Sequence, residues 1–201
     1  MKTRNQVLAF VLMVICGGSL RAQARKPDTE IAGGHVVLDA RQEKRAIQVF
    51  LKSVEKQIVS AAEAMPADKY GFAPTDGEFK GVRSFGQQVK HLAATNHILA
   101  AAALGEEPPA DAGDEAGPET ARTKAEILEY LNTSFTHLGR AIDAIDENNS
   151  TAKSSPISPL KKTETTRLAL TVEALIHAFN HYGQMVEYLR MNGVVPPASR
   201  P

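Results

Sequence analysis

The sequence predicts an all-α protein, a bundle of four long helices. Four segments, each of about 20–28 residues, repeat apolar side chains at spacings of three and four, the period of a helix with one buried face. No segment alternates apolar and polar residues as a half-buried strand does. The segments between the helices are rich in proline, glycine and charged residues. Helices of this length bury their apolar faces by packing together as a four-helix bundle.

Residues 1–24 predict a secretory signal peptide ahead of the bundle. Lys2 and Arg4 precede an apolar run over 7–16, and the segment ends in the cleavage pattern Ala-Gln-Ala. The run is shorter than the ~20 apolar residues of a spanning helix, so we expect cleavage and no stable membrane anchor. A lipid anchor at Cys16 is disfavoured because bulky Ile15 precedes it. The mature protein is therefore expected to be exported, either periplasmic or secreted.

The composition of the mature chain narrows its functional classes. Cys16 is the sole cysteine and leaves with the signal peptide, so the protein itself offers neither a disulfide nor a thiolate nucleophile. Cleavage also removes three basic residues and no acidic one, which leaves acidic residues in excess by three. A dedicated nucleic-acid-binding protein would show a basic excess, so no nucleic-acid partner is expected.

The four helices follow a flexible tail, predicted over 25–37, and form a bundle domain over 38–199. The expected helices cover 38–65, 84–104, 120–145 and 165–191. Asp39 is a plausible cap of the first, and Pro66 ends it. Ser84 opens the second helix with a capping box, S-x-x-Q, and Gly105 closes it. The connections over 105–119 and 146–163 are predicted as polar loops.

The fourth helix carries two histidines at helical spacing. Its main core stripe is predicted to consist of apolar residues in a seven-residue repeat, namely Leu168, Val172, Leu175, Phe179, Tyr182, Val186 and Leu189. His177 and His181 lie on another, mixed stripe, where the i, i+4 spacing places two imidazoles one above the other. They are either solvated surface residues or two ligands of a metal ion, which would need a third. The best third ligand is His91, on the second helix.

Three other polar residues are weaker candidates for the same site. Gln184 and Tyr188 share the histidine stripe and are predicted to line a pocket, and Glu173 is placed to orient an imidazole. Each is equally an ordinary polar residue on a helix. His97 and His137 are predicted to be surface or hydrogen-bonded histidines outside the site, because His97 lies about 240° around the helix from His91.

Four segments in this order resemble the DinB-like superfamily of bacterial four-helix proteins. They are AAEAMPADKYGFAPT (61–75), SFGQQVKH (84–91), HAFNHYGQ (177–184) and YLRMNGVVPPAS (188–199). The resemblance implies an up-up-down-down type of bundle and a three-histidine metal site made by His91, His177 and His181. It also implies metal-dependent transfer of low-molecular-weight thiols, although the known thiol cofactors are cytosolic and this chain is predicted to be exported. Homodimers are common among similar proteins.

The sequence therefore predicts an exported DinB-like protein that binds a divalent metal ion, zinc or nickel, through three histidines. The expected activity is that of a metal-dependent transferase or hydrolase acting on a small molecule. The alternative is a non-catalytic metal- or ligand-binding protein of the cell envelope, since the sequence offers no evident nucleophile or general base beside the histidines. A homodimer is possible.

Overall fold

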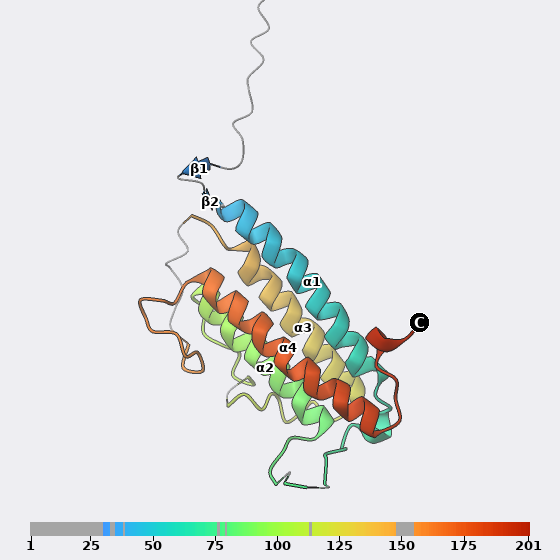
Figure 1. Ribbon diagram of the computed structural model, residues 1–201. Coiled ribbons are helices and arrows are strands. Elements are labelled where there is room, and N and C mark those ends of the chain that lie inside the picture. Colours follow the sequence, from blue (N-terminus) through green and yellow to red (C-terminus); the bar gives the residue numbers. More distant parts are fainter. Residues whose placement is uncertain are drawn as a thin grey trace, which may run out of the picture.

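Four long helices lie side by side and make up most of the molecule (Figure 1). The computed structural model describes residues 30–32, 35–37, 39–75, 77–78, 80–112, 114–147 and 155–201. Within these ranges the predicted all-α four-helix bundle is confirmed. The predicted signal peptide, 1–24, lies outside the described residues.

Each helix begins where the sequence supplies a capping side chain. The helices are α1 (Ala40–Ala64), α2 (Phe85–Leu104), α3 (Lys124–Asp143) and α4 (Arg167–Met191). At the start of α2 the Gln87 amide N–H donates to Ser84 Oγ at 3.4 Å, and the Ser84 amide N–H donates to Gln87 Oε1 at 2.8 Å. Gly105 then ends α2 in the left-handed conformation, with φ of 75°. These contacts determine where α2 begins and ends, and thereby the heights of its side chains in the bundle.

Short elements flank the bundle. Strands β1 (Glu30–Ala32) and β2 (His35–Val37) pair antiparallel, within the segment expected to be a flexible tail. Two 3-10 helices, η1 (Ala67–Lys69) and η3 (Pro197–Ser199), follow α1 and α4. In the part of the chain that the structure describes, every helix is too short or too polar to cross a bilayer.

Helix α1 runs antiparallel to α3. Lys44, near the start of α1, donates through Nζ to the carbonyl of Asp143, the last residue of α3, at 2.7 Å. At the other end Lys124, the first residue of α3, donates to the carbonyl of Met65 just beyond α1, at 2.8 Å.

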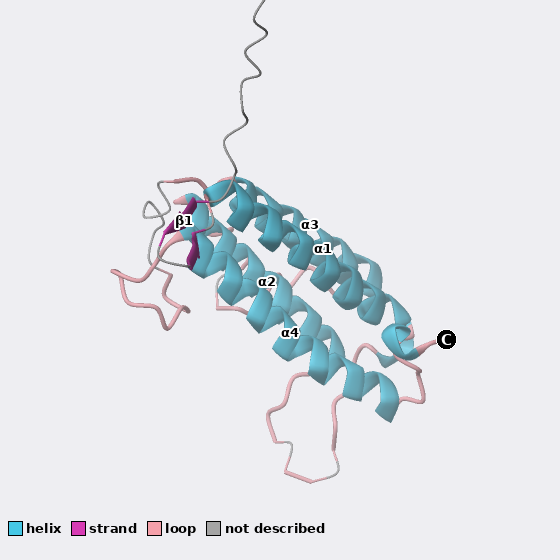
Figure 2. Cartoon of the chain, turned by 45° about the horizontal axis from the view of Figure 1, so that its top comes forward, coloured by secondary structure: helices cyan, strands magenta, loops and turns pink. Residues whose placement is uncertain are grey.

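Helix α2 runs parallel to α3 and antiparallel to α4. Gly86 and Ile127, near the starts of α2 and α3, pack against each other, so these two helices run parallel. The start of α4 contacts the end of α2, where Arg167 Nε donates to the Ala103 carbonyl at 3.1 Å, so α4 runs the other way. The four directions are thus up, down, down, up, as the sequence colours of Figure 1 show; Figure 2 views the same four helices from another side. The up-up-down-down order implied by the resemblance is corrected, because the consecutive helices that run parallel are α2 and α3. The connection between this pair, described over 105–112 and 114–123, returns along α2, where Lys90 Nζ donates to the Pro118 carbonyl at 3.0 Å.

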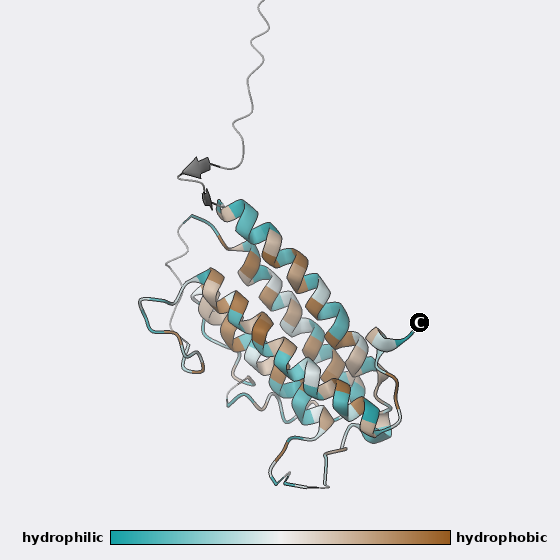
Figure 3. Ribbon diagram, viewed as in Figure 1, coloured by the Kyte–Doolittle hydropathy of each residue, from teal (hydrophilic) through white to brown (hydrophobic). Residues whose placement is uncertain are grey.

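The core lies between the four helices, along which apolar positions recur (Figure 3). On α4, however, the predicted core stripe is wrong in part. Phe179 is 44% exposed, and Val172 and Val186 are only partly buried. The buried face of α4 lies about a quarter-turn away and consists of Leu170, Thr171, Ala174, Leu175, Ala178, His181, Met185, Tyr188 and Leu189. Small alanines on this face admit close neighbours, a packing effect that counting large apolar residues overlooks. The rotation moves the histidine stripe toward the interior.

Candidate metal centre

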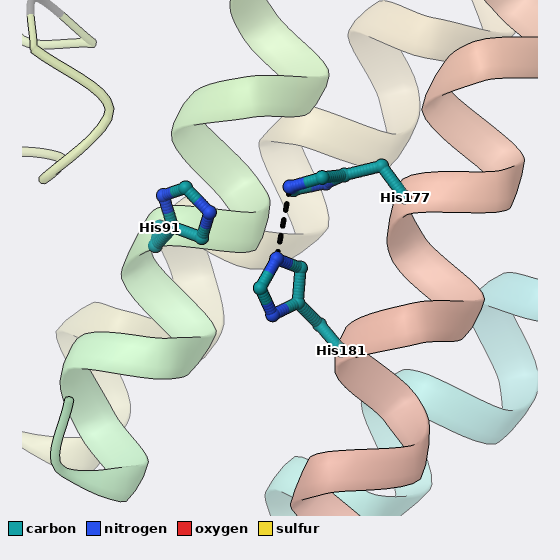
Figure 4. A group of neighbouring side chains, drawn as sticks. All are labelled: His91, His177 and His181. Atoms are coloured by element: carbon teal, nitrogen blue, oxygen red, sulfur yellow. Dashed lines mark hydrogen bonds between the residues drawn. The ribbon is translucent and has the colours of Figure 1, made fainter. Parts of the chain in front are cut away.

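The structure brings the three predicted histidines together at the α2–α4 interface. His91 comes from α2, and His177 and His181 come from successive turns of α4 (Figure 4). One ring nitrogen of each lies within 4.8 Å of the others, and Nε2 of His177 is 2.9 Å from Nε2 of His181. His91 and His181 are only 4% and 6% exposed, and His177 is half-buried. The three rings therefore face one small volume from two antiparallel helices.

His91 is held by the loop between α2 and α3. Its Nδ1 lies 2.9 Å from the carbonyl oxygen of Glu115. A carbonyl only accepts, so Nδ1 carries the proton and Nε2 keeps its lone pair. Glu115 has φ of 66°, the one positive φ at a non-glycine residue in the described ranges. The residue with this unfavourable backbone conformation is thus the one whose carbonyl orients the His91 ring.

His181 is contacted by Gln88, which in turn is held by Gln184 of α4. Nε2 of Gln88, on α2, lies within hydrogen-bond distance of His181 Nδ1 and also donates to Gln184 Oε1 on α4 at 2.8 Å. In this arrangement His181 Nδ1 accepts, so the proton of the neutral ring lies on Nε2. A half-turn of both amides presents Gln88 Oε1 instead, which accepts from His181 Nδ1–H and frees the Nε2 lone pair for a metal ion.

Gln184 was predicted from the sequence, and Gln88 was missed. Gln88 is 2% exposed and follows Gln87, the residue that completes the capping box. The sequence signal that could have found it is its spacing: Gln88 precedes His91 by three residues and therefore shares its side of the helix.

The other two predicted polar residues make contacts around the site. Tyr188 is buried, and its hydroxyl donates to the carbonyl of Arg83 at 3.0 Å, which ties α4 to the segment before α2. Glu173 accepts a hydrogen bond from Ser158 Oγ at 2.6 Å and so contacts the loop before α4. Its proposed role in orienting an imidazole stays a prediction.

Burial keeps the three rings neutral at physiological pH. Desolvation is the main cause that lowers the pKa of His177 to about 4 and that of His181 to about 3. It also lowers the pKa of His91, although the Glu115 carbonyl opposes this shift. The neighbouring histidines and the charge of Arg83 lower the pKa values of His177 and His181 further. Neutral imidazole is the form that binds a metal ion.

The residues present fit a divalent metal ion. Three nitrogens of neutral imidazoles converge, and contacts on the far side of His91 and His181 orient two of the rings. Nδ1 of His177 is buried and makes no hydrogen bond within the described residues. With His177 Nδ1 protonated, its Nε2 presents a lone pair beside His181 Nε2. Three histidines leave positions open for water or a substrate.

A second histidine pair lies apart from the triad. His97, on α2, faces α3, where its Nδ1 is 3.0 Å from Nδ1 of His137. Both are largely buried, and desolvation is the main cause that lowers the pKa of His97 to about 4. The prediction that His91 and His97 do not share a site is confirmed, and His97 is hydrogen-bonded as expected.

Comparison with known proteins agrees with this geometry. A family model described as the DinB superfamily matches residues 51–185 of the chain. The matched range contains all three histidines and both glutamines. No curated protein matches the chain.

Proposed function

The chain belongs to the DinB superfamily, and from this premise we propose that it is an exported metal-dependent transferase or hydrolase that acts on a small molecule. One observation carries the proposal: three buried, neutral imidazoles converge from two helices. A purely structural ion is usually enclosed by four protein ligands, whereas a three-ligand site retains a position for chemistry. Zinc and nickel both suit imidazole nitrogen.

His91, His177 and His181 would hold the ion, and Gln88 and Gln184 would orient the ring of His181. When bound, the ion would act as a Lewis acid that favours the anionic form of a coordinated thiol or water. The protein supplies no cysteine in its mature form, so a thiol nucleophile must come from a small molecule. The buried ring faces would exclude bulk water and keep the ligands deprotonated.

The alternative function is non-catalytic binding of a metal ion or a ligand in the cell envelope. It is favoured by the lack of an acid that contacts the inner face of the triad among the described residues. The acid found near the triad is Glu115, whose Oε2 is 3.6 Å from Nδ1 of His91, on the side of the ring turned away from the other two histidines. From there the carboxylate cannot serve directly as a general base for a molecule held between the rings.

Export follows from the predicted signal peptide, and the homodimer follows from the resemblance. Both are part of the proposal. Cell fractionation and sedimentation of the mature chain, 25–201, test them.

Elemental analysis of the untagged mature protein tests the metal site. We expect about one zinc or nickel ion per chain in the wild type and none in His177→Ala. His137→Ala is the matched control, because it removes a largely buried histidine outside the triad and should leave the metal content unchanged.

The two functions are separated by assays with the metal-loaded protein. Thiol transfer or hydrolysis that requires metal and is lost in His177→Ala supports the enzyme. A broad substrate screen without turnover by fully loaded protein favours the binding protein. A wild-type chain that remains metal-free after incubation with zinc and with nickel contradicts metal binding by the triad and favours a ligand-binding protein or a scaffold.

A further inference from the structure

A cavity lined by two basic side chains lies near the start of α2, among sequence neighbours of His91 and of the residue that holds it. It has a volume of about 240 Å³ and is lined by Gly81, Val82, Arg83, Gln87, Lys90 and Ala116. Two of its lining residues are chain neighbours of the residues around His91: Lys90 precedes this histidine on α2, and Ala116 follows Glu115, whose carbonyl oxygen contacts His91 Nδ1. The cavity therefore lies on the α2 side of the triad, toward the Nδ1 edge of His91.

Among the described residues, two basic side chains and no acidic one line this cavity. Arg83 is exposed, and its guanidinium has no hydrogen-bond or ion-pair partner within the described residues. Lys90 Nζ donates to the Pro118 carbonyl at 3.0 Å, which uses one of the three donors of an ammonium group. Both cations thus retain donors that an anion could accept from.

The backbone of Arg83 is held in place by α4. Its carbonyl accepts from the hydroxyl of Tyr188, which is 5% exposed and packs against Phe72 and Phe85. The charge of Arg83 also acts on the triad. Burial is the main cause that lowers the pKa values of all three histidines, and the positive charge of Arg83 lowers them further. The positive charge is thus part of the surroundings of the triad.

The amides at the start of α2 do not supply the donors of this cavity. The amide N–H of Phe85 donates to the Phe72 carbonyl, and that of Gly86 donates to the Tyr70 carbonyl, both at 2.8 Å. The amide of Gln87 is engaged by Ser84 Oγ. Recognition of an anion therefore depends on the side chains of Arg83 and Lys90.

We propose that this cavity binds a carboxylate or phosphate group of the small molecule whose other end reaches the triad. This inference rests on the proposed metal-dependent function and deepens it by naming the substrate class, a small anion. Arginine presents paired donors that match the two oxygens of a carboxylate or phosphate, and lysine adds a second point charge.

Binding of an anion is tested first on the metal-free protein, with succinate as the probe and amide chemical shifts by NMR as the readout. We expect saturable shifts centred on Gln87, Lys90 and Ala116, weakened about three- to tenfold in Arg83→Gln, as fits one exposed charge-assisted contact. Arg45→Gln, at an exposed arginine near the start of α1, is the control and should bind like the wild type. Shifts that are absent in the wild type, or a succinate affinity that is unchanged in Arg83→Gln, overturn the proposal.

The link to the triad is tested on cobalt-loaded protein with two thiols, mercaptosuccinate and neutral 2-mercaptoethanol. Sulfur-to-cobalt absorption should show tighter binding of the anionic thiol, and Arg83→Gln should reduce this preference without weakening the neutral thiol. Equal binding of the two thiols to the wild type refutes the link. Failure of cobalt to bind instead refutes the proposed metal site, and the succinate titration still decides whether the cavity binds anions.

Discussion

Replacing Gln88 with methionine should weaken metal binding while the bundle stays folded. A metal-binding His181 needs its Nε2 lone pair, so its proton must lie on Nδ1, and Gln88 is the residue that contacts Nδ1. Methionine has a similar length and fills the buried site without an acceptor. An unsatisfied buried N–H costs about 1–3 kcal/mol, which corresponds to roughly 5- to 150-fold weaker binding.

The assay is competition for zinc against a chromophoric chelator, at neutral pH, together with thermal unfolding of the metal-free chain. Gln88→Glu is the informative partner, because a carboxylate accepts from His181 Nδ1–H and should keep or increase the affinity. Gln87→Met is the control on the same helix. It removes the bond to the Ser84 amide and should lower stability by about 1 kcal/mol without changing zinc affinity.

A folded Gln88→Met protein with wild-type zinc affinity would refute the tautomer argument. Equal losses in Gln88→Met and Gln88→Glu would also contradict it, since only the first variant removes the acceptor.

Three further predictions concern stability and the loop over the site. The metal-free protein should lose stability as the pH falls from 6.5 toward 4. In the unfolded chain the histidines bind protons near pH 6.5, whereas folded His177 and His181 do so only near pH 4 and 3. A urea unfolding midpoint that stays constant across this pH range would contradict the argument from burial. Glu115→Gly should retain zinc affinity, since His91 contacts the backbone carbonyl of this residue and glycine adopts positive φ freely. Glu115→Pro should weaken zinc binding in the same chelator assay, because proline requires negative φ. Gly86→Ala should lower the melting temperature because its Cβ would lie 3.2 Å from the backbone oxygen of Tyr70. Gly183→Ala, with open space around it, should raise stability by about 0.5–1 kcal/mol; the same sign for both would count against the close packing of Gly86 against Tyr70 and Ile127.

The helices and two of the histidines follow from local rules. Ser84 and Gln87 lie three residues apart, so the start of α2 depends on contacts within one turn. The pairing of His177 with His181 likewise needs only the i, i+4 geometry of a helix. His91 is indicated as the third member partly by its height along α2 and partly by the family resemblance. Spacing along the chain does not by itself predict a contact between two helices.

Other features of the site depend on contacts between distant segments. Gln88 contacts His181 across the α2–α4 interface. The Glu115 carbonyl contacts His91 from the connection that the sequence predicts as a polar loop. Neither contact has a periodic signal, because each joins residues more than 20 positions apart. The same holds for Arg83, an exposed arginine whose charge matters because of where Tyr188 holds its backbone.

The sequence alone determined the helix-forming segments, their caps and the presence of imidazoles at metal-binding spacing, since these depend on the chemistry of residues within a few positions of one another. Tertiary structure decided the direction of each helix and the face that α4 buries. These features depend on how closely the alanine-rich surfaces of α2 and α4 approach and on the path of residues 105–123 along α2. The same packing brings the three histidines, Gln88 and the cationic cavity together at one end of the interface, where each acquires its orientation and charge state.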